Sequence, residues 1–211
     1  MPHVVLLGDS IFDNAAYVAG GPDVIAQLRG VLPGGWSATL CAVDGAVVAD
    51  VERQLARVPR EGTHLVVSVG GNDALGHVDL LNRPARSSAE VLGQLGDAGR
   101  AFEGRYRRML AAVLERGLPA TVCTIYNGNL PDALTQRLAS TALTVFNDAI
   151  LRTAIETGTS VIDLRLLCNE PADYANPIEP SVRGGAKIAR AVARAVTERR
   201  ADGTRTEVFA C

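Results

Sequence analysis

VVLLGDSIFDN, residues 4–14 of the chain, joins an apolar run to a polar turn. Val4 to Leu7 are consecutive apolar residues, two of them β-branched, and predict a short strand that is buried on both faces. Gly8-Asp9-Ser10 then favours a turn over further strand. A serine at the carboxyl end of a buried parallel strand lies where open α/β sheets bind their ligands. Taken alone, the pattern also fits an ordinary strand-to-loop turn.

The rest of the chain alternates β-rich runs with helical patterns. Besides residues 4–7, we expect strands at 36–43, 64–69, 120–126 and 160–164. Helical patterns occupy 23–32, 47–58, 88–116, 131–156 and a last segment that begins after Ser181. Residues 74–86 have no clear period and are expected to be irregular. This alternation predicts an α/β fold, in which right-handed crossovers connect a five-stranded parallel sheet to helices on both faces.

Length and charge limit the classes of function. A chain of 211 residues suits one α/β domain, which we place at residues 1–200, followed by a polar tail at 201–211. A net charge of -2 gives no electrostatic reason to expect a nucleic acid or an anionic membrane as partner. The sequence has neither a signal-peptide pattern nor an apolar run that could span a bilayer, so we expect a soluble, cytoplasmic protein. Its oligomeric state is left open.

The cysteines and histidines are scattered. Cys41, Cys123, Cys168 and Cys211 show no C-x-x-C spacing, so all four are expected to be reduced thiols. No cluster has the spacing of metal ligands, and no glycine-rich nucleotide motif is present. We therefore expect neither a metal nor a cofactor.

Two more turns follow predicted strands. They are VDGA at residues 43–46 and VVSVGGND at residues 66–73. Together with Gly8-Asp9-Ser10, they occur in the order and at about the spacing found in the GDSL-type, or SGNH, hydrolases, which the chain resembles from Met1 to about Arg200. The resemblance implies a three-layer α/β/α fold of the flavodoxin-like SGNH type. It also implies a serine esterase that acts on a small-molecule ester.

The resemblance assigns roles to particular residues. Ser10 would be the nucleophile, and its backbone N–H would donate to the oxyanion. The backbone N–H of Gly45 and the side-chain amide of Asn72 would be the other donors. Glycine allows the backbone to approach the reacting carbonyl closely, and an amide NH₂ can donate while its oxygen is held elsewhere. Asp9 would hold the turn beside the substrate through its side-chain hydrogen bonds.

The last block of the family is altered here. The family has an aspartate, two residues of any type and a histidine, whereas this chain has NPIEPSVRGG at residues 176–185. The Pro-Ser step and Gly184 fix the alignment. Glu179 then stands in place of the histidine and Asn176 in place of the aspartate. The usual Ser-His-Asp mechanism therefore does not transfer directly.

One interpretation makes Glu179 the base. An unperturbed glutamate is about two pKa units less basic than histidine, a deficit of roughly 2.7 kcal/mol that partial burial would reduce. An aspartate beside Glu179 would repel it, whereas the amide of Asn176 could donate to its carboxylate. The paired change of both residues favours this interpretation.

Two other interpretations remain open. His77 follows the Asn72 turn and could reach the site, with Asp173 as a displaced acid, whereas His3 and His64 lie at the wrong ends of their strands. Alternatively, the fold keeps its pocket and is a catalytically weak ligand-binding protein, or an acyltransferase that uses the same serine. We expect a hydrolase of a small ester or thioester that uses Ser10, with Glu179 as the base.

Overall fold

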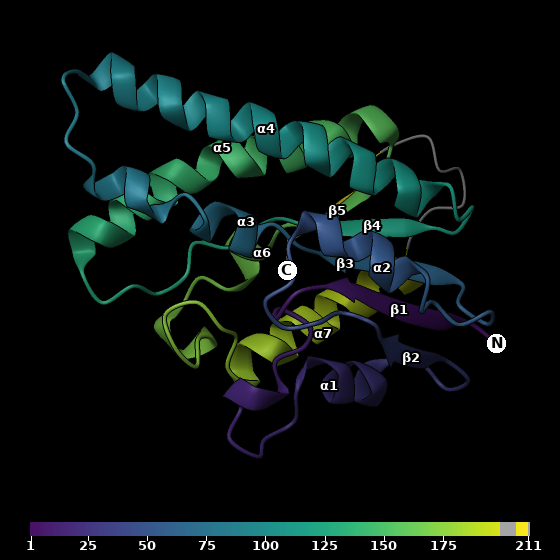
Figure 1. Cartoon of the computed structure of the whole chain (residues 1–211). Coiled ribbons are helices and arrows are strands. Elements are labelled where there is room, and N and C mark those ends of the chain that lie inside the picture. The colour runs from purple at the N-terminus through teal and green to yellow at the C-terminus, as the bar shows by residue number, and fades with distance from the viewer. Residues whose placement is uncertain (199–205, 211) are drawn as a thin grey trace.

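The computed structural model describes residues 1–198 and 206–210, which form a parallel sheet between two layers of helices (Figure 1). The strands are β1 (His3–Gly8), β2 (Ser37–Leu40), β3 (His64–Ser68), β4 (Ala120–Cys123), β5 (Ser160–Ile162) and β6 (Val208–Phe209). The α-helices are α1 (Val24–Val31), α2 (Val51–Leu55), α3 (Gly71–Leu75), α4 (Ser88–Leu114), α5 (Ala133–Thr157), α6 (Leu164–Leu167) and α7 (Val182–Thr197). Short 3₁₀ helices are η1 (Ala15–Tyr17), η2 (Val48–Asp50), η3 (Val78–Asn82) and η4 (Pro171–Asp173).

The apolar run of β1 is buried on both faces, as its sequence predicts. Val4 and Leu6 pack in the cluster that contains α1 and α7, whereas Val5 and Leu7 pack in the cluster that contains α2, α4 and α5. Figure 1 shows these two groups of helices on opposite faces of the sheet. The expected α/β/α layering is confirmed.

The sheet has six strands rather than the expected five, in the order β2-β1-β3-β4-β5-β6 with every pair parallel. The additional strand, β6, pairs with β5 through Val161–Val208 and Ile162–Phe209. We expected a polar tail there, because a two-residue strand is too short to show a period in the sequence. The rest of that tail, residues 201–205 and 211, lies outside the described residues.

The short helices were also not predicted from the sequence. The segment expected to be irregular, 74–86, contains the end of α3 and all of η3, and the helix expected at 47–58 is divided into η2 and α2. Helices of three to five residues do not complete enough turns to show an amphipathic pattern. No described helix is both long and apolar enough to cross a membrane.

The described cysteines are free thiols. Cys41, Cys123 and Cys168 are all buried. Cys211 lies outside the described residues.

The strand order places the predicted nucleophile in a crevice. The chain runs from β1 out to β2 and then crosses back to β3 on the other side of β1. The loops that leave the carboxyl ends of β1 and β3 therefore diverge, and in open parallel sheets ligands bind at such a point. Ser10 follows β1, and Asn72 follows β3.

Gly8 brings the ends of these two strands together. Its φ is +121°, and a Cβ added there would lie 1.8 Å from the carbonyl oxygen of Ser68. The next residue, Asp9, donates its N–H to that same oxygen at 3.0 Å. The side chain of Gln54 accepts from the N–H of Gly8 at 2.7 Å and donates to its carbonyl at 2.8 Å. The turn that carries Ser10 is therefore fixed by its backbone.

We expect Gly8→Ala to destabilise the fold by about 3 kcal/mol or more, because the methyl group meets a backbone carbonyl and the positive φ disfavours any side chain. Gly30→Ala is the matched control, since Gly30 lies in α1 with open space around it and the change should stabilise by about 0.5–1 kcal/mol. Urea unfolding measures both. Equal stability of the two variants would contradict the close packing of β1 on β3.

Candidate active site

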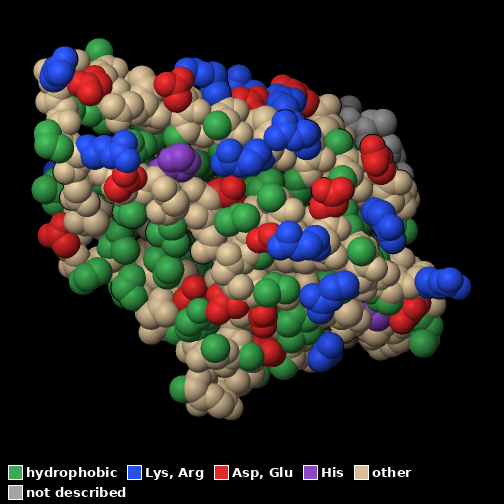
Figure 2. Space-filling model, viewed as in Figure 1, with side chains coloured by type: hydrophobic (Ala, Val, Ile, Leu, Met, Phe, Trp, Pro, Cys, Tyr) green, Lys and Arg blue, Asp and Glu red, His purple; other side chains and the backbone are tan. Residues whose placement is uncertain are grey.

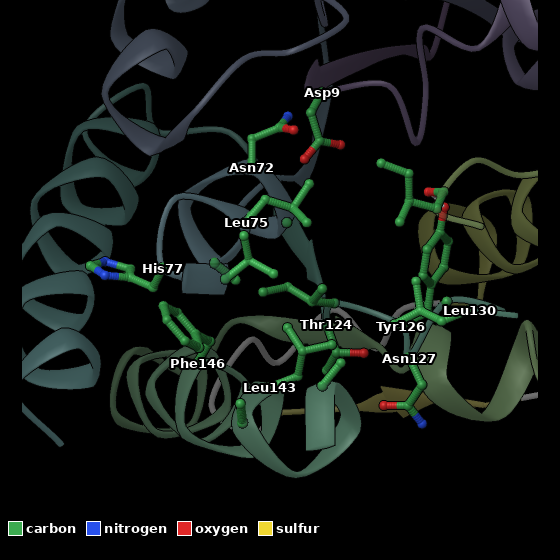
Figure 3. Close-up of a pocket in the computed structure, with 18 of the residues that line it drawn as sticks. Asp9, Asn72, Leu75, His77, Thr124, Tyr126, Asn127, Leu130, Leu143 and Phe146 are labelled. Carbon is green, nitrogen blue, oxygen red and sulfur yellow. Dashed lines mark hydrogen bonds between the residues drawn. The ribbon is translucent and has the colours of Figure 1, made fainter. Parts of the chain in front are cut away.

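A cavity of about 250 Å³ opens at the carboxyl ends of the central strands (Figure 3). Asp9, Ser10, Asn72, His77 and Glu179 all line it, together with apolar side chains from α3, η3, α4 and α5. The structure thus brings most of the site residues expected from the sequence to a single cavity.

Ser10 and Glu179 are hydrogen-bonded across 169 positions of sequence. The hydroxyl of Ser10 donates to Oε1 of Glu179 at 3.0 Å, and the two residues are only 7% and 5% exposed. This distance lies within the range in which a base accepts a proton from a nucleophile. The carboxylate is therefore close enough to the hydroxyl to accept its proton.

Burial changes the acidity of Glu179. The pKa of its carboxyl is raised from 4.5 to about 7, chiefly by loss of hydration and also by the charge of Asp44, whereas the hydrogen bond from Ser10 acts to lower it. The other carboxyl oxygen, Oε2, is buried without a hydrogen-bond partner. The pKa deficit of glutamate relative to histidine is thereby removed.

The backbone around Glu179 is anchored at four consecutive carbonyls. Those of Pro177, Ile178, Glu179 and Pro180 accept hydrogen bonds from Asn129 N–H (2.8 Å), the Tyr126 hydroxyl (2.6 Å), Ala175 N–H (2.9 Å) and Asn14 Nδ2 (3.2 Å), respectively. Asn129 and Tyr126 lie in the loop after β4. Ala175 lies in the same loop as Glu179, and Asn14 lies in the turn after β1. The segment is therefore held against the rest of the sheet edge.

Asn176 acts on the backbone of this segment. Its Oδ1 accepts from the N–H groups of Ile178 and Glu179, both at 2.9 Å, and its side chain is exposed. We expected its amide to donate to the Glu179 carboxylate instead. Asparagine oxygens commonly accept from the N–H two residues on, so the Asn-Pro-Ile-Glu sequence did carry the signal for this turn.

Two of the three expected oxyanion donors, Gly45 and Asn72, lie on adjoining turns. Nδ2 of Asn72 donates to the carbonyl of Ala46 at 2.9 Å, which ties the turn after β3 to the turn that contains Gly45. Gly45 has a φ of +76° and is exposed. An NH₂ group carries two hydrogens, so Asn72 keeps one for a ligand.

Asp9 is a second buried carboxyl beside the nucleophile. Its Oδ1 accepts from the N–H of Ile11 at 3.2 Å, as expected for a residue that holds the turn. Its pKa is raised from 3.8 to about 8, chiefly by burial and also by the nearby charge of Glu179, against the lowering effect of the Ile11 hydrogen bond. Near neutral pH, Asp9 is therefore largely uncharged.

The imidazole considered as an alternative base lies elsewhere in the cavity. The His77 ring packs near Phe146, with 6.1 Å between ring centroids, and Figure 3 shows it at the end of the cavity away from Asp9. Its suggested partner Asp173 is buried in an ion pair with Lys187 at 2.6 Å. No group of three or more His, Cys, Asp or Glu among the described residues could hold a metal ion.

Sequence analysis did not identify the long-range hydrogen bonds of Asn14 and Tyr126 to the segment that carries Glu179. Asn14 is fully buried, and its Oδ1 also accepts from the N–H of Val24 at 2.9 Å. Asn14 and Pro180 are 166 positions apart, so no local pattern relates them.

Comparisons with known proteins identify family and fold. The model of the GDSL-like Lipase/Acylhydrolase family matches residues 6–187. Comparison with curated proteins gave no match.

Solved structures show the same fold at low sequence identity. An extracellular lipase from Streptomyces rimosus is 17% identical, with a TM-score of 0.67 over 89% of this chain and 96% of that chain. A phospholipase A1 from Streptomyces albidoflavus is 17% identical, with a TM-score of 0.65 over 88% and 94%. An acetyl xylan esterase from Geobacillus stearothermophilus is 19% identical, with a TM-score of 0.60 over 92% and 94%. The fold implied by the sequence motifs is confirmed.

The raised pKa of Asp9 predicts how the free energy of unfolding changes with pH. The folded state holds this proton more tightly than the unfolded chain, so the stabilisation is complete below about pH 4 and is lost as the pH rises towards 8. Asp9→Asn keeps an acceptor for Ile11 but carries no charge. We expect it to raise the free energy of unfolding at pH 8.5 by about 1–3 kcal/mol, with a smaller gain at pH 5.5.

Urea unfolding at both pH values measures this effect. Asp97→Asn, which changes an exposed carboxylate on α4, is the control and should leave the pH dependence unchanged. A wild-type protein whose stability does not fall between pH 5.5 and 8.5, or an Asp9→Asn variant that shows the same fall, would contradict the assignment.

Proposed function

Because the chain belongs to the GDSL-like lipase/acylhydrolase family, we propose that this ester-bond hydrolase uses Ser10 as its nucleophile and Glu179, in place of histidine, as its base. The proposed substrate is a small ester or thioester. The hydrogen bond from Ser10 Oγ to Glu179 Oε1 is the observation that carries the proposal.

In the first half of the proposed reaction, the Glu179 carboxylate accepts the hydroxyl proton as Ser10 Oγ attacks the acyl carbon. The carbonyl electrons move onto oxygen, and the resulting oxyanion is stabilised by the N–H groups of Ser10 and Gly45 and by the Asn72 amide. The Glu179 carboxyl then gives the proton to the departing oxygen or sulfur, and the acyl group remains on Ser10. Water repeats the sequence and releases the acid.

Two properties of Glu179 support this role. Its pKa of about 7 places its proton affinity near the working range of a general base at neutral pH. The four anchored carbonyls from Pro177 to Pro180 fix the backbone from which its side chain projects. In a Ser-His-Asp triad a carboxylate orients the imidazole, whereas here we assign the orienting task to the anchored backbone.

The first test replaces each candidate in turn. A fluorophosphonate should label the wild type but not Ser10→Ala, and Ser10→Ala should lose about 10³-fold or more in kcat/KM on a short aryl ester. Glu179→Gln should lose about 10²- to 10⁴-fold, because an amide cannot accept the proton. His77→Ala, changed in the same cavity, should stay within about threefold of the wild type.

The outcomes separate the alternatives. Loss with His77→Ala and retention with Glu179→Gln would assign the base to the imidazole. An unlabelled wild type without esterase activity would favour a ligand-binding protein. We also expect kcat/KM to rise with pH through about 7 as Glu179 ionises, which is the range of histidine, so the pH profile must be compared between variants.

The second test addresses the anchored backbone. Tyr126→Phe removes the hydroxyl that donates to Ile178 and keeps the ring; burial holds the pKa of this hydroxyl well above its usual value, so it remains a donor. We expect kcat to fall about 10- to 100-fold with KM nearly unchanged, and the apparent pKa of the pH profile to shift.

Tyr174→Phe is the matched control. Its ring packs edge-on against that of Tyr126, but its hydroxyl donates to the carbonyl of Cys168 at 2.5 Å. It should keep the wild-type pH profile and kcat within about threefold. Equal effects of both variants would show that the Tyr126 hydroxyl only supports the fold.

A further inference from the structure

One arm of the cavity extends well beyond the groups that the proposed chemistry uses. Its wall is built from η3 and the helices around it, and it is mostly hydrocarbon: Leu75, Val78, Leu81, Leu95, Leu143 and Phe146. His77 and Thr135 are polar members of the lining. Leu75 and Val78 are 43% and 53% exposed, although both are large apolar residues. This part of the cavity therefore presents apolar surface that the protein itself does not cover.

The position of the base decides which half of an ester enters this arm. Tyr126, which bonds the backbone next to Glu179, lies on one side of the cavity with Leu130, whereas Leu143 and Phe146 lie on the other side with His77 (Figure 3). The leaving group must stay beside Glu179 because it receives the proton from that carboxyl. The acyl group is then directed away from Tyr126, into the apolar arm.

The lining determines the chemistry of that acyl group. A charged or hydroxylated chain would lose its hydration against leucine, valine and phenylalanine side chains without gaining equivalent hydrogen bonds. A hydrocarbon chain instead removes both its own surface and that of Leu75 and Val78 from water. Figure 2 shows hydrophobic side chains gathered on the surface of the protein over the segment that leads into α5.

The size of the cavity limits the chain length. A water molecule takes about 30 Å³ of liquid, and a methylene group is of similar size, so the whole cavity of about 250 Å³, from the space beside Ser10 to the end of the arm, holds at most about eight to ten carbons. Ala139 and Ala142 of α5 contribute small side chains to the wall and leave that space free.

We propose that the apolar arm between η3, α4 and α5 binds a straight, medium-length hydrocarbon acyl chain of the substrate. This inference rests on the proposed function and specifies the acyl half of its substrate. The specificity-determining residues are those of the α5 wall, Ala139, Ala142 and Leu143.

The first measurement is kcat/KM on p-nitrophenyl esters with two to sixteen acyl carbons. We expect a rise of about two- to fourfold for each methylene up to about eight carbons, because each buried methylene adds hydrophobic stabilisation, and a fall beyond about ten. A maximum at the acetyl ester would overturn the proposal and leave the Ser10 chemistry intact.

Variants of the wall test the location. Ala142→Phe should move the optimum to four carbons or fewer. Ala133→Phe on the same helix is the control, since Ala133 is exposed and outside the cavity lining, and it should keep the wild-type optimum. Leu143→Ala enlarges the arm and should move the optimum to longer chains. An optimum unchanged in both Ala142→Phe and Leu143→Ala would place the acyl chain elsewhere.

A binding measurement separates this proposal from the function on which it rests. Octanoate should raise the melting temperature of Ser10→Ala and of Ala133→Phe, but not of Ala142→Phe, and acetate should have no such effect. Octanoate protection in a wild type that cleaves no ester would overturn the proposed function and retain the binding arm. Ester cleavage without octanoate protection, and with the acetyl ester preferred, would overturn the arm alone.

Discussion

The close approach of β1 to β3 at Gly8 sets the geometry of the whole site. With a side chain at this position, the backbone could not lie against the Ser68 carbonyl, and Asp9 could not donate to that same oxygen. The turn that follows would then leave the sheet at a different angle. Because Ser10 lies two residues beyond this contact, its direction is fixed by backbone packing rather than by its own side chain.

In the proposed mechanism, burial gives Glu179 the basicity that the identity of the side chain gives histidine in the usual triad. A glutamate in water is too weak a base for neutral pH, and the low-dielectric surroundings of Glu179 raise its pKa to about 7. The same surroundings raise the pKa of Asp9 to about 8. Ionisation of either of these two neighbouring carboxyls therefore lowers the free energy of unfolding. Functional sites commonly carry such a cost, which the core offsets.

The order of strands and helices was predictable because each depends on local patterns. Both faces of β1 are buried, and its four apolar residues already indicated this. The segments that were mispredicted are short: η3 and β6 have five and two residues and gain their stability from neighbours that are distant in sequence. Asn176 was assigned to the correct segment, but the direction of its hydrogen bonds depends on the turn that its own backbone adopts.

The sequence by itself determined the α/β architecture and the turn that holds Ser10, because periodicity and motif spacing are properties of neighbouring residues. That Glu179 stands in place of the family's histidine follows from the resemblance and stays a prediction. The sequence left open whether Glu179 or His77 is the base. Only the tertiary structure placed Glu179 3.0 Å from the serine hydroxyl and His77 against Phe146. The pKa of Glu179 could likewise not be predicted from the sequence, because the desolvation of its carboxyl depends on what the folded chain packs around it.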